Sequence, residues 1–117
     1  MNLIELYKAT ESNYDEAVLR FSTEEKINKF LGMFLKDSSF AELQAAVAAK
    51  DWDAAFRAVH TLKGVAGNMS LTRLRSSASE LTEAIRDGKV LADYALYDAV
   101  CKDYEMVTSK IKAYLGF

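Results

Sequence analysis

The chain has 117 residues, the length of one ordinary domain, and its 50% hydrophobic and 27% charged residues are typical of a folded protein. It has no proline and only five glycines, which disfavours an all-β sandwich or barrel and favours helices with short connections. The net charge of -2 gives no support for binding to nucleic acid or to an anionic membrane, and no apolar run reaches the ~20 residues of a membrane span.

The cysteine and histidine counts limit the chemistry further. Cys101 is the only cysteine, which excludes an internal disulfide and a multi-cysteine metal site. His60 is the only histidine, which excludes a zinc site with two or three histidines and makes any nucleophilic triad depend on this residue. The N-terminus lacks the basic and apolar regions of a signal peptide. We therefore expect a cytoplasmic protein without a metal site.

Apolar residues recur at helical spacing almost from one end of the chain to the other, without an internal repeat or a linker. Two short helices are expected first, and longer ones follow. In chain order, the expected helices span about 2–9, 14–21, 23–36, 40–49, 52–69, 73–87 and 92–115.

Several residues predict where these helices begin and end. The stretches 22–25 and 39–42 each start with serine and finish with glutamate, the spacing of a capping box. Asp51 is expected to cap the helix after it, and Gly88 to end the helix before it. Long helices joined by short loops pack as antiparallel neighbours. The predicted fold is all-α, an up-and-down antiparallel four-helix bundle with short extra N-terminal helices.

The predicted domain organisation is a single unit over 1–117. In it, residues 1–21 form an N-terminal helical extension that covers one end of the bundle, and residues 22–115 form the bundle itself.

His60 lies on the outward side of the helix predicted over 52–69. At 100° per residue it projects away from the core, on the same side as Lys63, Gly64 and Gly67. The core stripe of this helix is expected to consist of Ala55, Ala58, Leu62, Val65, Ala66 and Met69.

The residues beside His60 suggest a chemical role for it. Each of the two glycines costs about 1 kcal/mol relative to alanine in a helix, and the core does not require them, so they leave room for another molecule to approach the imidazole. Lys63 is a helical neighbour of His60. Its ammonium group favours a neutral, nucleophilic imidazole and would neutralise an anion on the ring. This combination favours a transient phosphate on His60. The alternative is a helix kink near Gly64 with an uninvolved histidine and a solvated lysine.

Residues 51–68 resemble the histidine-containing phosphotransfer (HPt) domain, whose core pattern is His-x-Leu-Lys-Gly followed by small residues. The resemblance extends from about Phe21 to Leu115, and the length suits a free-standing HPt protein. It implies that Nε2 of His60 accepts a phosphoryl group from the aspartate of a response-regulator receiver domain and passes it to a second receiver. The chain would be a phosphocarrier in two-component signalling and not an enzyme.

The resemblance also implies roles for neighbouring residues. Lys63 would contact the phosphoryl oxygens, and Gly64 and Gly67 would leave room for the receiver's loops. Phe56 and Arg57 are candidates for docking. The expected partners are receiver domains and a hybrid or other sensor histidine kinase. Mg²⁺ is expected on the receiver, with no cofactor on this chain, which is expected to be a monomer.

Two positions depart from the family pattern. Many members have glycine ten residues after the histidine, where this chain has Ser70. Members also often carry Glu or Gln twenty-two residues after it, bonded to Nδ1 of the ring, and this chain has Thr82 there. Orientation of the ring is therefore expected to fall to Thr82 or to water.

Other functions were weighed against this one. A di-metal bundle needs inward Glu-x-x-His pairs, which are absent. A DNA-binding domain needs a basic stripe. The basic residues of this chain form only a loosely spaced group, which is expected to form a rim facing an acidic partner. The members of that group are Lys63, Arg73, Arg75 and Arg86. A helical adaptor that carries no phosphate and the phosphoacceptor domain of a chemotaxis-type kinase stay open as alternatives.

Overall fold

The structure is a computed structural model that describes residues 1–117. It contains helices and no strands, so the all-α prediction is confirmed. The elements are α1 (Leu3–Ala9), α2 (Tyr14–Phe21), α3 (Glu24–Phe34), α4 (Ser39–Ala48), α5 (Trp52–Asn68), α6 (Thr72–Ala84), the 3₁₀ turn η1 (Arg86–Gly88) and α7 (Ala95–Leu115).

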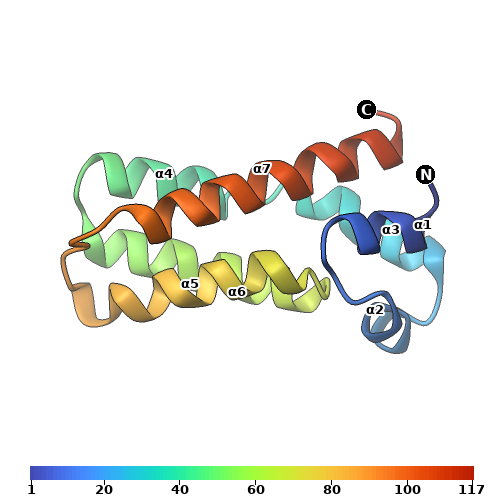
Figure 1. The fold of residues 1–117 in the computed structure, drawn as a ribbon, viewed down its shortest axis with the longest axis horizontal. Coiled ribbons are helices and arrows are strands. Elements are labelled where there is room, and N and C mark those ends of the chain that lie inside the picture. Colours follow the sequence, from blue (N-terminus) through green and yellow to red (C-terminus); the bar gives the residue numbers. More distant parts are fainter.

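Four helices form the bundle. Figure 1 shows α4, α5, α6 and α7 running antiparallel in chain order, with α5 packed between α4 and α6, and α6 packed against α7. The first three helices, α1, α2 and α3, gather at the end where α5 turns into α6. The predicted up-and-down bundle with short extra N-terminal helices is therefore confirmed.

One hydrophobic core runs through the whole chain. It includes Leu3, Leu6 and Tyr7 of α1, each only 1% exposed, and extends to Ile111 of α7. The Tyr7 hydroxyl also donates a hydrogen bond of 2.8 Å to the Met69 carbonyl at the end of α5. The N-terminal helices thus share the core of the bundle.

The core side of α5 follows the predicted stripe with two exceptions. Val65 is only half-buried, and Val59, which was not assigned to the stripe, is fully buried. The other predicted members are buried: Ala55, Ala58, Leu62, Ala66 and Met69. This packing leaves the side of α5 that carries His60 exposed.

Both predicted capping boxes are wrong. At α3 the cap is Thr23, whose hydroxyl accepts from the Lys26 amide at 3.2 Å, because Ser22 has a φ of +72° and cannot face the helix. At α4, Ser39 is already the first helical residue, and its amide donates to the Asp37 carboxylate at 2.9 Å. The predicted cap at Asp51 is confirmed, since its carboxylate accepts from the Ala54 amide at 3.1 Å.

The connection between α6 and α7 is longer than predicted. The helix stops at Ala84 and not at Asp87, because Ile85 already leaves the helical conformation with a φ of -114° and a ψ of 16°, and Asp87 and Gly88 follow with positive φ, +61° and +75°. The last helix begins at Ala95 and not near residue 92. The Asp93 carboxylate accepts from the Ala95 amide at 2.9 Å, which fixes the start of the helix there.

Candidate functional site

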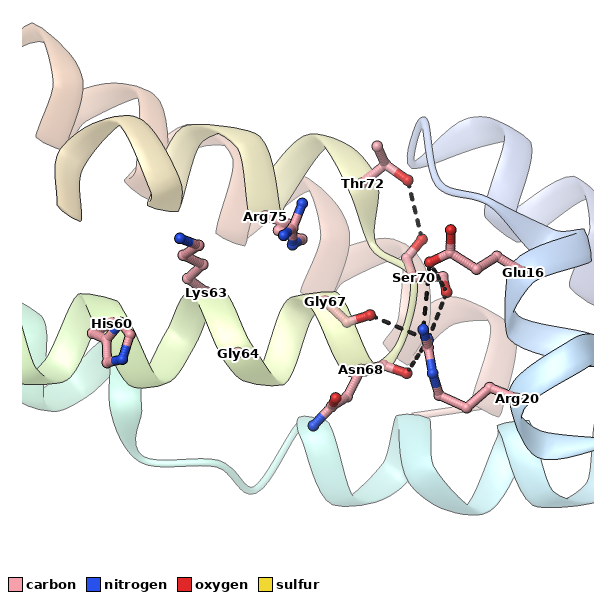
Figure 2. A pocket seen from close by; sticks show the side chains of 10 residues that line it. All are labelled: Glu16, Arg20, His60, Lys63, Gly64, Gly67, Asn68, Ser70, Thr72 and Arg75. Atoms are coloured by element: carbon pink, nitrogen blue, oxygen red, sulfur yellow. Dashed lines mark hydrogen bonds and ion pairs between the residues drawn. The ribbon is translucent and has the colours of Figure 1, made fainter. Parts of the chain in front are cut away.

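A polar hollow of about 580 Å³ opens on the exposed side of α5. Figure 2 shows that its lining comes from α5, from the first turn of α6 and from α2. No apolar side chain lines it, so it suits a charged ligand better than an apolar one. The lining residues are Glu16, Arg20, His60, Lys63, Gly64, Gly67, Asn68, Ser70, Thr72 and Arg75.

His60 is exposed at one end of this hollow, and its imidazole forms no hydrogen bond or ion pair within the chain. The ring is instead held by packing. It lies parallel to the Phe56 ring one turn earlier, with centroids 5.8 Å apart and an interplanar angle of 5°. Both ring nitrogens therefore stay available to a partner.

Phe56 is itself covered by a residue of η1, which follows α6. The Arg86 guanidinium lies 5.6 Å from the centroid of the Phe56 ring, within the range of a cation–π contact. Arg86 is bonded to Glu83, and this hydrogen bond holds the pKa of the Glu83 carboxyl below its usual value. Phe56 thus lies between His60 on its own helix and Arg86, thirty residues later in the chain, and local sequence patterns do not reveal this second contact.

The expectation that Thr82 orients the His60 ring is wrong. Thr82 is fully buried in α6, and its hydroxyl donates to the Ala78 carbonyl at 2.7 Å. A threonine within a helix satisfies its hydroxyl in this way on the carbonyl four residues earlier. It makes no bond to the imidazole.

Lys63 points from α5 toward α6 in Figure 2 and is half-buried in the hollow. It takes part in none of the ion pairs of the chain, which use Arg20, Arg73 and Arg86. Beyond the larger effect of Arg86, Lys63 also lowers the pKa of Glu83. Its ammonium group is therefore free to bind an anion beside His60.

The two glycines beside His60 differ in their surroundings. A Cβ added at Gly64 would meet nothing within 4 Å, so this position is open to solvent, as the clearance prediction requires. A Cβ at Gly67 would lie 3.1 Å from both Cδ and Nε of Arg75. The prediction for Gly67 is therefore corrected, because the space that it leaves is taken by a side chain of α6.

The end of α5 is held by α2. Arg20 donates to the carbonyls of Gly67 at 3.2 Å and Asn68 at 2.8 Å, and to the Ser70 hydroxyl at 2.9 Å. The Ser70 hydroxyl in turn donates to Glu16 at 2.8 Å. These partners are 47 to 54 residues apart in the chain, so sequence patterns did not reveal them.

Ser70 adopts a φ of +57°, the left-handed conformation that glycine adopts at no steric cost. The departure noted at this position thus concerns the turn between α5 and α6. The serine hydroxyl is used there, since it joins Glu16 and Arg20 of α2 to the turn.

The basic residues expected to form a rim behave in different ways. Arg73 bonds to Glu11 and, at 3.0 Å, to the buried carboxylate of Asp103, so it joins the turn after α1 to α6 and α7 and its charge is already paired. Arg75 and Arg57, the second of which was predicted as a docking residue and not as part of the rim, are exposed and form no ion pair. Of these two, only Arg75 lines the hollow.

Two further properties of the structure bear on function. No group of three or more His, Cys, Asp or Glu side chains is arranged so that it could hold a metal ion. None of the helices combines the length and the apolar character needed to cross a membrane.

Comparison with known proteins gives one family. The family model described as the Hpt domain matches residues 29–110, well over half of the chain, and the match includes α4, α5, α6 and most of α7. No curated protein and no solved structure matches the chain.

Proposed function

Because the chain belongs to the Hpt domain family, we propose that it is a phosphorelay intermediate that carries a phosphoryl group on His60 between receiver-domain aspartates. The family performs histidine phosphotransfer in two-component signalling, and its members are phosphocarriers that interact with kinases and receivers. The family match does not identify the donor, the recipient or the acceptor residue, and all three are parts of the proposal.

A single observation supports His60 as the acceptor. Histidine phosphotransfer requires a histidine, and this chain has only one. That residue lies within the matched segment, is exposed on α5, and opens into a polar hollow that contains an unpaired lysine. Each of these properties is needed by a phosphoacceptor, and a bystander histidine would need none of them.

The proposed step is an in-line transfer. The lone pair of His60 Nε2 attacks the phosphorus of the receiver's aspartyl phosphate, an N–P bond forms, and the P–O bond breaks as the carboxylate leaves with its electron pair. The ring carries the positive charge until Nδ1 releases its proton to water. Transfer to the second receiver reverses these steps.

Such a transfer needs positioning and charge neutralisation more than covalent help from the protein. Lys63 supplies a positive charge one turn from the acceptor, and Gly64 leaves an open surface for the receiver's loops. The receiver supplies the aspartate and a Mg²⁺ that neutralises phosphoryl oxygens. Phe56 and Arg57 would lie at the docking surface around His60, and the carrier acts in the cytoplasm as a monomer.

The proposal is tested by a complete relay. A receiver domain labelled on its aspartate is mixed with a second receiver, with the wild-type chain, with His60→Gln or with neither. We expect label on the second receiver only with the wild-type chain. Equal transfer with His60→Gln would instead support an adaptor that brings the two receivers together without carrying phosphate.

A further inference from the structure

Arg75 is a cation of the polar hollow that the sequence predicted only as a rim residue facing an acidic partner. It lies on α6, is exposed, and shares the hollow with His60 and Lys63. Figure 2 shows its side chain in the space between α6 and α5, on the side toward which Lys63 also points. Arg75 is therefore either a solvated surface charge or part of the site that binds the phosphoryl group.

The charges around Arg75 favour a role in binding the phosphoryl group. The only carboxylate that lines the hollow is Glu16, and it is already engaged by Arg20 at 3.6 Å and by the Ser70 hydroxyl. Arg20, in turn, is occupied by the carbonyls at the end of α5. Arg75 and Lys63 are thus the two cations of the hollow without a partner.

The position of Gly67 supports the same conclusion. Gly67 lies seven residues after His60, which places both on the same side of α5, about 10 Å apart along the axis. The Arg75 side chain lies against this glycine, because a Cβ at Gly67 would lie only 3.1 Å from Cδ and Nε of Arg75. Lys63 lies on the same face between them. An exposed arginine changes rotamer within nanoseconds, so the side chain can extend along α5 toward an anion on the ring.

We propose that Arg75 is the second cation of the site and contacts the phosphoryl group on His60 from α6, opposite Lys63 on α5. The inference rests on the proposed function, since it needs phosphate on His60. Gly67 then accommodates the Arg75 side chain, which a Cβ at this position would crowd. A guanidinium offers several donors in a fixed plane and matches phosphate oxygens, while the lysine acts as a point charge.

The test measures the phosphoryl group itself. Wild type and Arg75→Gln are loaded from a receiver phosphorylated with acetyl phosphate, separated from it, and titrated by ³¹P NMR. Loss of a positive charge in contact with the phosphoryl group, about 4 Å away in water, raises the midpoint of the second phosphate ionisation by about 0.7 pH unit. Arg75→Lys is expected to keep the wild-type midpoint, and Lys102→Gln, an exposed cation of α7 outside the hollow, is expected to do the same.

The role of Gly67 is tested with a double-mutant cycle. Gly67→Ala displaces the Arg75 side chain and is expected to raise the midpoint in the wild-type background but not in Arg75→Gln. Equal midpoints for phosphorylated wild type and Arg75→Gln would overturn the inference and leave the proposed function intact. Absence of phosphate from wild-type His60 would overturn both.

Discussion

The residues around His60 fall into two groups: some face open space, and others pack against the rest of the protein. Gly64 faces open space, whereas Gly67 accommodates Arg75. Thr82, which was expected to orient the histidine, bonds only to its own helix. The His60 ring is held instead by the parallel ring of Phe56. At this scale, the site is an exposed imidazole with one open side.

Gly64→Ala is expected to separate stability from transfer. A Cβ there meets nothing within 4 Å, so the substitution stabilises the helix by up to about 1 kcal/mol. In the proposed transfer the same methyl group would lie where the receiver's loops approach, and misplacing reacting atoms slows transfer by about 10- to 100-fold. Urea unfolding and the rate of label transfer from a receiver measure the two effects.

Gly32→Ala in α3 is the matched control, because its Cβ also meets nothing within 4 Å and it lies outside the hollow. It should gain stability with no change in transfer. An equal transfer rate for Gly64→Ala and wild type would show that the open space at Gly64 is not used by the partner.

Ser70 combines an unfavourable backbone conformation with two useful hydrogen bonds. Ser70→Ala loses both bonds and keeps the φ of +57°, whereas Ser70→Gly loses the bonds but tolerates that conformation. We expect Ser70→Gly to be more stable than Ser70→Ala by about 1 kcal/mol, measured by urea unfolding. Equal stabilities would mean that the turn relaxes out of the left-handed conformation.

At the scale of elements, α2 determines how α5 ends. The last carbonyls of a helix have no partner within it, and Arg20 of α2 supplies donors to two of them. The same guanidinium bonds to Ser70 in the following turn. Since that turn sets where α6 begins, α2 helps to fix the distance between Lys63 on α5 and Arg75 on α6.

Arg20→Ala is expected to destabilise the chain by about 1 kcal/mol, because the hydrogen bonds that it loses are partly exposed and water replaces some of them. Thermal and urea unfolding measure the change. Lys26→Ala in α3, an exposed cation whose side chain forms no bond, should leave stability unchanged. Equal stability of the two variants would show that α2 does not restrain the end of α5.

The elements also show what the sequence could predict. The helices and the exposed face of α5 follow from apolar spacing, which is a local property, and so His60, Lys63 and Gly64 lie as predicted. The cap at Ser22 failed because the neighbouring Thr23 competes for the same role. The contacts of Arg20 with Ser70 and of Arg75 with Gly67 join separate helices, and only the packing of the bundle brings them together.

At the scale of the whole molecule, the family match and the core do not have the same limits. The match begins at residue 29, yet the core includes Leu3, Leu6 and Tyr7 of α1. Arg73 adds an ion-pair network that links the turn after α1 to α6 and α7. The N-terminal helices are therefore expected to contribute to the stability of the bundle that holds His60.

Leu6→Ala tests this expectation. Leu6 is 1% exposed, and truncation of a buried leucine destabilises a protein by about 2–5 kcal/mol. Ile4→Ala on the same helix removes a side chain that is 54% exposed and should change stability by no more than about 0.5 kcal/mol. If Leu6→Ala were as mild as Ile4→Ala in urea unfolding, α1 would be a loosely attached appendage.

The most direct measurement is the labelling of His60 by a phosphorylated receiver domain, with wild type and His60→Gln side by side. We predict label on the wild type that is labile in acid and stable in alkali, as phosphohistidine is, and no label on His60→Gln. Both proteins should show the same helical circular dichroism, because His60 is exposed and bonded to nothing. A folded wild-type chain that several receivers fail to label, or label that persists in His60→Gln, would contradict the account.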